Sequence, residues 1–289
     1  MMTDAAQSRQ RDGVPAFRRR LAGSRAPLLT LATLGMALVV LPLLGLIART
    51  DWPGLLTHLR APVVWPAIRL SLITTLITLG LAMLLGTPLA WLLSRATGRL
   101  ATWMRALLTV PVVLPPVVGG VALLLAYGMN GLVGAPVFDA LGLRIPFTPL
   151  AVVLAQLFVS LPFYVLAVEG AMRSVDPRFD HVAATLGASP TRVFLRVGLP
   201  LAAPGIAAGA AMAWARALGE FGATITFAGN LTGRTQTAPL AVYVALQSDP
   251  QAAIALSIAM LAVSIAVLGL LRGRWMGLLS RRTSGHAEA

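Results

Sequence analysis

The sequence predicts an all-α polytopic membrane protein with six transmembrane helices, and three observations lead to this fold class. Apolar residues make up 57% of the 289 residues, whereas charged residues make up only 11%. Apolar runs of about 20 residues, the length that crosses a bilayer as a helix, recur along the chain. Arginines flank these runs, as they do in the loops of membrane proteins.

The first two spans lie in the N-terminal third of the chain. Residues 1–26 form an Arg-rich tail, and residues 27–49 contain the first transmembrane helix. A signal peptide is the alternative for this segment, but its apolar run is long for one, and Ile47-Ala48-Arg49 makes a poor cleavage site. The second span covers about Leu70–Leu93.

The third span, about Ala106–Ala126, contains Pro111, Pro115 and Pro116. Proline removes a backbone donor, so we expect this helix to be kinked or broken. Two interpretations stay open. The break is either a packing kink or irregular backbone that lines a transport pathway.

The last three spans are predicted at about Leu150–Val168, from after Pro204 to near Ala228, and at about Gln251–Leu271, followed by a tail at residues 273–289. Between the third and fourth spans, Pro136–Leu143 can form a small helix on the membrane surface.

Arginine asymmetry predicts the orientation. All 23 basic residues are Arg, and most of them fall in the two tails, after the second span and in the segment 169–200. By the positive-inside rule, both termini and the segment 169–200 are cytoplasmic.

The segment 169–200 is the longest polar stretch between apolar runs. It is interrupted at Asp176-Pro177 and again from Gly187 to Pro190. Its composition predicts two short helices, Arg178–Leu186 and Thr191–Val197, joined by a turn at Gly187. Glycine suits that turn because a helix C-terminus often needs a residue with positive φ.

A charged pair lies within the predicted fifth span. Arg216 and Glu220 are four residues apart and therefore share a helix face. Each costs about 2.5–3.5 kcal/mol at a helix centre, so both are expected to face protein or water. The pair either fixes the bundle as an internal salt bridge or belongs to a pathway or gate, where Thr224 and Thr226 can offer hydroxyls to a passing anion.

Composition excludes several classes of function. The chain has no Cys, so it has no disulfide or thiol chemistry. It has no Lys, so it lacks the phosphate-binding loop of ATPases, and any ATP must be bound by another chain. Its three His are far apart in sequence, so we expect no metal, no cofactor and no catalytic centre. The net charge of +13 follows from the arginines beside the apolar runs and does not indicate nucleic-acid binding.

The spacing within the polar segment resembles the "EAA" loop of ABC-importer permeases. Aligned on Gly187, the segment has His181-Val182-Ala183 at the E-A-A positions, then Val197, Leu199 and Pro200 at the later positions. The Glu and one Ala of the pattern are missing here, which leaves the role of the first acidic residue open.

A second stretch is more specific. Ala215–Asn230 reads ARALGEFGATITFAGN, and Gly233–Tyr243 reads GRTQTAPLAVY. Both closely resemble the molybdate permease subunit of bacterial ABC importers, and Val110–Gly120 fits the same oxyanion group. Sulfate permeases share the Arg-Ala-Leu-Gly-Glu core but usually diverge after it. The resemblance covers residues 67–272.

The resemblance implies a type I ABC importer permease fold in the inner membrane. Two permease chains, here expected to be a homodimer, would form the pore, two ATPase subunits would dock on the cytoplasmic loops, and a periplasmic molybdate-binding protein would deliver the ligand. Transport would follow alternating access driven by ATP on the partner. The implied docking residues are His181, Val182, Ala183, Leu186, Gly187, Val197, Leu199 and Pro200. The pathway candidates are Pro115, Pro116, Arg216, Glu220, Thr224 and Thr226.

Three other interpretations remain. The docking loop can be a solvated surface segment. The cargo can be sulfate, thiosulfate or tungstate, because selection is expected largely in the binding protein. The chain can also be an ATPase-independent channel or a membrane enzyme, although an enzyme would show more polar residues converging within the helices.

Overall fold

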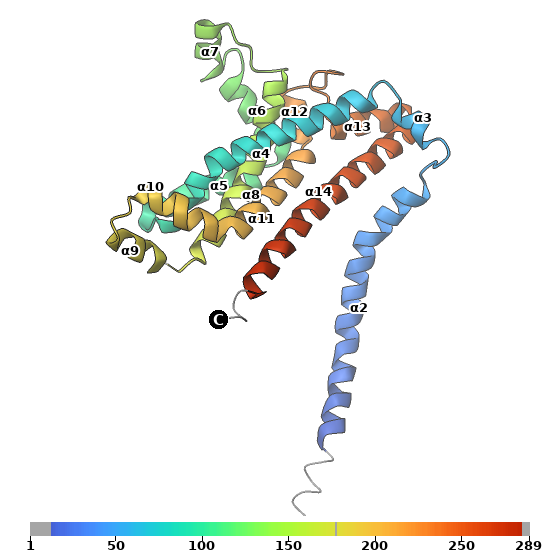
Figure 1. The fold of residues 1–289 in the computed structure, drawn as a ribbon. Coiled ribbons are helices and arrows are strands. Elements are labelled where there is room, and N and C mark those ends of the chain that lie inside the picture. The colour runs from blue at the N-terminus through green and yellow to red at the C-terminus, as the bar shows by residue number, and fades with distance from the viewer. Residues whose placement is uncertain (1–12, 177, 285–289) are drawn as a thin grey trace, which may run out of the picture. The chain divides into compact units, whose positions relative to one another are not determined.

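The computed structural model describes residues 13–176 and 178–284, and the chain divides into two units, Met1–Asp51 and Trp52–Ala289. The ends of the two predicted tails, residues 1–12 and 285–289, lie outside the described residues. Every regular element in the described part is a helix (Figure 1), which confirms the all-α fold class.

The described part of the first unit consists mainly of one long helix, α2 (Gly13–Ala48). Its stretch Pro27–Ala48 has 22 residues with a mean hydropathy of 2.4, which is long and apolar enough to span a bilayer. The side chains of this stretch are almost all exposed, including Leu38 and Leu41. Such a surface suits contact with lipid rather than water.

Three long helices form the centre of the second unit: α4 (Val64–Arg95), α8 (Pro149–Arg173) and α11 (Leu199–Leu218). Helix α8 packs extensively against both of the others (Figure 1). Small residues permit this close packing. A Cβ on Gly209 of α11 would lie only 3.2 Å from the carbonyl oxygen of Tyr164 on α8. On the α4 side, the Thr87 and Tyr164 hydroxyls are 2.7 Å apart and buried.

The predicted third span is broken, as the prolines indicated. Helix α5 (Gly98–Val113) and helix α6 (Pro116–Tyr127) are bent by 115° at Leu114 and Pro115. Leu114 has extended backbone, with ψ at 130°, because the residue before a proline avoids the helical region. Helix α5 begins earlier than predicted, so Arg99 and Arg105 are helical residues rather than loop residues.

The predicted fifth span is wrong at both ends. The observed helix begins before Pro204, whereas the predicted start lies after it. Helix α10 (Pro190–Val193), the π-helical turn η1 (Phe194–Gly198) and α11 follow one another directly. Leu199-Pro200 therefore lies inside a helix instead of preceding one. In a π turn, backbone hydrogen bonds join residues that are five apart, so the turn is wider than that of an α-helix. This wider turn accommodates Pro200, which has no backbone N–H to donate. The span also ends at Leu218, and a separate short helix, α12 (Gly222–Phe227), follows.

The remaining helices complete the unit. Helices α3 (Leu55–Leu59) and α13 (Ala238–Ser248) were not predicted, whereas α7 (Gly134–Leu141) corresponds to the small helix expected there. Helix α14 (Pro250–Ser284) packs against α13 and α3.

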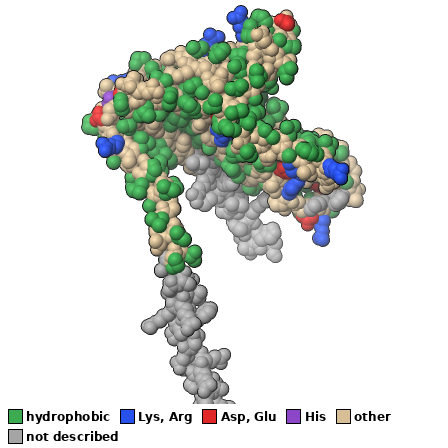
Figure 2. Space-filling model, turned by 180° about the vertical axis from the view of Figure 1, so that it is seen from behind, with side chains coloured by type: hydrophobic (Ala, Val, Ile, Leu, Met, Phe, Trp, Pro, Cys, Tyr) green, Lys and Arg blue, Asp and Glu red, His purple; other side chains and the backbone are tan. Residues whose placement is uncertain are grey.

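By length and composition, the described residues contain five helices able to cross a membrane, or six when the bent pair α5–α6 counts as one span. Figure 2 shows the outer surface of this arrangement. On the visible face of the second unit, apolar side chains are spread widely, and most of the charged side chains lie toward its margins. This distribution is the one that a bilayer imposes on a helical bundle.

Candidate functional site

The polar segment forms two helices around a tight turn. Helix α9 (Arg178–Thr185) begins where the Asp176 carboxylate accepts a hydrogen bond from the Arg178 backbone N–H at 2.9 Å. It ends at Gly187, whose φ is +78°, as predicted. The N–H groups of Gly187 and Ala188 donate to the carbonyls of Ala184 and Ala183, both at 3.0 Å. This is a Schellman motif, which needs a left-handed residue at the glycine position.

One face of α9 carries an exposed apolar stripe. Phe179, Val182 and Leu186 follow the i, i+3, i+7 spacing and are 53%, 59% and 82% exposed. Leu186 and Val182 were docking candidates, while Phe179 was not singled out, although the same spacing identifies it. Ala183 is half-buried. The side chain of His181 lies outside the described residues.

The other docking candidates belong to a different element. Val197 lies in η1, and Leu199 and Pro200 lie in the first turn of α11. Val197 and Leu199 are half-buried, and Pro200 is exposed. They follow α9 in the chain but are not part of its apolar stripe. We therefore call Phe179, Val182 and Leu186 alone the α9 stripe.

Two ion-pair clusters, which the sequence analysis did not predict, lie at the same end of the bundle as α9. In the first, Arg95 at the end of α4 binds Asp180 of α9 through both Nε and Nη2, at 3.0 and 2.7 Å. In the second, the buried Glu169 accepts from Arg105 of α5 at 2.7 Å and pairs with Arg173 at 2.9 Å.

Glu169 was expected in a cytoplasmic loop, but it lies within α8 and its side chain is only 5% exposed. A buried carboxylate needs charged or hydrogen-bonding partners. Arg105 also donates from Nη2 to the carbonyls of Leu93 and Ala96, so it binds the open C-terminus of α4 as well. The i, i+4 spacing of Glu169 and Arg173 was the one available sequence signal for this cluster.

The predicted pair in the fifth span does form. The Arg216 and Glu220 side chains are 2.6 Å apart, with Glu220 only 1% exposed. Glu220, however, lies just beyond the end of α11 rather than on its face. Its other carboxylate oxygen accepts from the Ala223 backbone N–H at 2.7 Å, so Glu220 also begins helix α12. Thus Glu220 connects the end of α11 to the start of α12.

Helices α6 and α12 pack against one another. A Cβ on Gly222 of α12 would lie 2.8 Å from the Pro116 side chain of α6, and the Thr226 hydroxyl lies 3.5 Å from the Val117 carbonyl. The structure therefore brings Pro116 and Thr226 together at one junction. Thr224 is fully buried, and its hydroxyl has no hydrogen-bond partner among the described residues.

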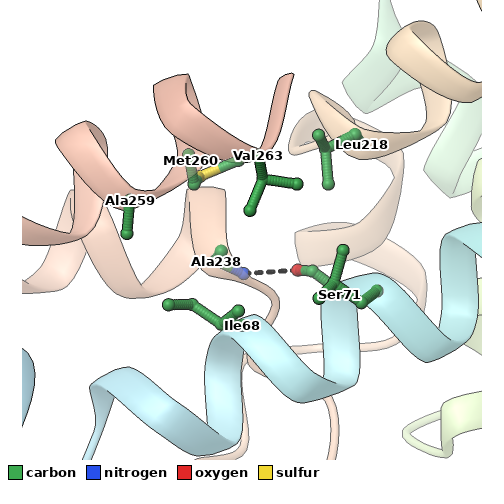
Figure 3. A pocket seen from close by; sticks show the side chains of 8 residues that line it. Ile68, Ser71, Leu218, Ala238, Ala259, Met260 and Val263 are labelled. Atoms are coloured by element: carbon green, nitrogen blue, oxygen red, sulfur yellow. Dashed lines mark hydrogen bonds between the residues drawn. The ribbon is translucent and has the colours of Figure 1, made fainter. Parts of the chain in front are cut away.

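A small cavity lies where α13 meets α4 and α14. Figure 3 shows its apolar lining and the Ser71 hydroxyl, which accepts a 2.7 Å hydrogen bond from the Ala238 backbone N–H. The cavity measures about 10 Å³, too little for an oxyanion. The Ser71 bond satisfies the first turn of α13, so this place joins α13 to α4.

Comparison with known proteins identifies the class. Residues 82–285 match the family described as the inner membrane component of binding-protein-dependent transport systems, and the chain belongs to this family. It is therefore a multi-pass inner-membrane transport subunit. Its fold is similar to that of a chain in the crystal structure of a bacterial alginate ABC transporter bound to its periplasmic protein. That match has a TM-score of 0.68 at 15% identity and covers 88% of this chain and 93% of the other.

Curated relatives narrow the comparison. The molybdenum transport system permease protein ModB of Mycobacterium tuberculosis is 47% identical over 240 residues, which cover 83% of this chain and 90% of that protein. ModB of Escherichia coli K12 is 38% identical and covers 76% and 96% of the two chains. The sulfate transport system permease protein CysT of the same organism is 32% identical, with 93% and 98% covered.

Proposed function

We propose that this chain is the permease subunit of an ATP-driven importer that moves molybdate across the inner membrane. The observation that carries the proposal is 47% identity to a molybdenum permease over most of both chains. The sulfate permease, at 32% identity, is less similar although it covers more of the chain. Molybdate is therefore the primary candidate, and tungstate, sulfate and thiosulfate are the alternatives within the class.

The α9 stripe is the proposed docking surface for an ATPase subunit. Three exposed apolar side chains on a short helix, anchored at both ends by its caps, form a rigid knob of the kind that fits a groove. The positive φ of Gly187 lets the chain reverse directly after the stripe, so α9 can project from the bundle. The partner would supply the ATP site, which this Lys-free chain lacks.

The proposed transport cycle is alternating access. ATP would bring two ATPase subunits together, and the two α9 helices of a homodimeric pore would follow them. The junction of α6 and α12, with Pro116 and Thr226, is the proposed moving part near the pathway. At this junction the Arg216 charge is already neutralised by Glu220 at 2.6 Å, which suits a gate or conduit better than a tight anion site.

The proposal includes a topology. The α9 end of the bundle would face the cytoplasm with both termini, and the end that carries α7 and α13 would face the periplasmic molybdate-binding protein. The Arg distribution supports this orientation. The alternative class of function, a channel or enzyme that works without an ATPase, does not explain why the α9 stripe is exposed.

ATP hydrolysis by the purified complex, reconstituted with its ATPase and binding protein, tests the function. We expect molybdate to stimulate hydrolysis and tungstate to compete, while sulfate has little effect. Stimulation by sulfate but not by molybdate would reassign the cargo.

Co-purification tests the docking surface separately. Leu186→Ser should lose the ATPase from the detergent-extracted complex. Leu132→Ser, at an 88% exposed position between α6 and α7, should retain it and serves as the matched control. Retention of the ATPase in both variants would contradict docking through the stripe.

A further inference from the structure

The last turn of α4 contacts both helices of the polar segment. Trp91 and Arg95 are four residues apart and share a helix face, and the Arg95 guanidinium lies over the Trp91 ring, 5.7 Å from its centre. Arg95 also donates to the Ser94 hydroxyl at 2.8 Å and to the Met172 carbonyl of α8 at 3.4 Å. Its side chain is therefore held in one direction by several partners.

From this position Arg95 contacts α9. Two of its nitrogens donate to the same carboxylate oxygen of Asp180, at 3.0 and 2.7 Å. The pair is partly buried, with 29% and 24% of the two side chains exposed, so water screens it less than it screens a surface pair. The other Asp180 oxygen is buried without a hydrogen-bond partner. Arg95 is thus the cation that holds this carboxylate among the described residues.

Trp91 contacts the second helix of the segment. Its ring lies 5.3 Å from the ring of Phe194, the first residue of η1, and a Cβ on Gly198 would be 3.4 Å from its indole nitrogen. One turn of α4 therefore holds α9 by charge and η1 by aromatic packing. Both are the segments through which the proposed docking loop joins the bundle.

The neighbouring cluster fixes α4 independently. Arg105 binds Glu169 of α8 and the carbonyls of Leu93 and Ala96, which ties the end of α4 to α5 and α8 without Arg95. Loss of Arg95 would therefore release α9 but leave the bundle assembled. The Arg105 cluster therefore stabilises the bundle, whereas the Arg95 cluster positions the loop.

We propose that Arg95 is a positioning residue that couples the docking helix to the bundle, so that a displacement of α9 by the ATPase moves α4 as well. This inference rests on the proposed function. Without the Arg95–Asp180 pair, α9 follows the ATPase alone, and the complex hydrolyses ATP while moving less molybdate.

The test is the number of molybdate ions transported per ATP hydrolysed in proteoliposomes that contain the full complex. In Arg95→Ala and Asp180→Asn we expect this ratio to fall by about tenfold, within the range of coupling between linked sites. The ATPase should still co-purify in both variants. Arg99→Ala is the matched control, because Arg99 is exposed in the next helix, and it should keep the wild-type ratio.

A covalent replacement gives the second measurement. The chain has no Cys, so Arg95→Cys combined with Asp180→Cys introduces the only thiols of this subunit. A short bifunctional thiol reagent that joins them should raise the ratio of the double variant toward the wild-type value. A role that depended on the Arg95 charge itself, rather than on the connection between α4 and α9, would not be restored by this link.

The outcomes are distinct. An unchanged ratio in Arg95→Ala overturns the inference, as does loss of the ATPase from that variant, which would mean that Arg95 builds the docking surface itself. Failure of the cross-link to restore transport in a complex that retains its ATPase also overturns it. A wild-type complex that transports no molybdate would instead contradict the proposed function.

Discussion

Gly205 on α11 lies so close to Ala171 on α8 that a Cβ on the glycine would overlap the alanine methyl group. The contact lies near the C-terminal end of α8, in the first half of α11. It allows the backbones to approach as only small residues permit.

Gly205→Val should therefore destabilise the bundle. The added side chain must push α11 away from α8, and overpacking of this kind costs about 1–3 kcal/mol. Thermal unfolding in detergent measures the effect. Gly80→Ala on α4, where no atom of the part of the chain that the structure describes comes within 4 Å of the added carbon, should leave the melting temperature nearly unchanged. Equal melting temperatures for the two variants would show that the close approach is absent.

Gly187→Val should abolish uptake while leaving membrane insertion intact. The φ of +78° at Gly187 costs a residue with a side chain about 1–2 kcal/mol, and more for a β-branched one. None of the described residues lies within 4 Å of the added carbon, so the effect comes from the turn and from the partner's groove. Gly187→Asn tolerates this conformation and should retain part of the molybdate uptake. Wild-type uptake by Gly187→Val would remove the turn from the docking assignment.

Glu220→Ala should harm assembly more than Glu220→Gln does. Alanine leaves Arg216 without its partner and the Ala223 N–H without its acceptor, whereas glutamine keeps an acceptor oxygen. Removing one partner of a buried ion pair lowers the free energy of unfolding by ~3–5 kcal/mol. We expect a loss at the low end of this range for Glu220→Ala, because Arg216 is 26% exposed. Protein levels and molybdate uptake report the difference. Indistinguishable variants would mean that the pair carries little of the junction's stability.

Arg105→Ala should destabilise the protein more than Arg173→Ala, although both arginines bind Glu169. Arg105 is 25% exposed and also binds two carbonyls of α4, whereas Arg173 is 49% exposed. We expect the free energy of unfolding to fall by about 3 kcal/mol in Arg105→Ala and by less than about 1 kcal/mol in Arg173→Ala. Thermal unfolding in detergent checks the order, and the reverse order would contradict the role of Arg105.

Much of the fold could be predicted from local patterns. Apolar runs predicted most of the membrane-crossing helices, the prolines predicted the break before α6, and Gly187 predicted the left-handed turn. The spacing of Arg216 and Glu220 predicted their contact. Each of these features depends on residues that are close together in the sequence. Hydrophobic periodicity, the conformational freedom of the backbone and the cost of burying a charge can all be judged from such local sequence.

Other features depend on distant contacts and could not be predicted in this way. Arg95 and Asp180 are 85 residues apart, and only the packing of α4 against α8 brings them together. The burial of Glu169 needs Arg105 from another helix. The continuous helix through Pro200 was missed because a proline usually ends a helical pattern, and the π turn that accommodates it has no simple sequence signal.

Helices α10, η1 and α11 follow one another from Pro190 to Leu218, 29 residues in all. At about 1.5 Å per residue, this rod is about 43 Å long, and its close contact with α8 at Gly205 and Gly209 divides it into arms of roughly 25 and 15 Å. A rigid rod that tilts about this pivot moves its two ends in opposite directions. A displacement at the docking end would therefore move Arg216 in the opposite direction and by little more than half the distance. Spin labels placed near the two ends of the rod would report these opposite movements directly.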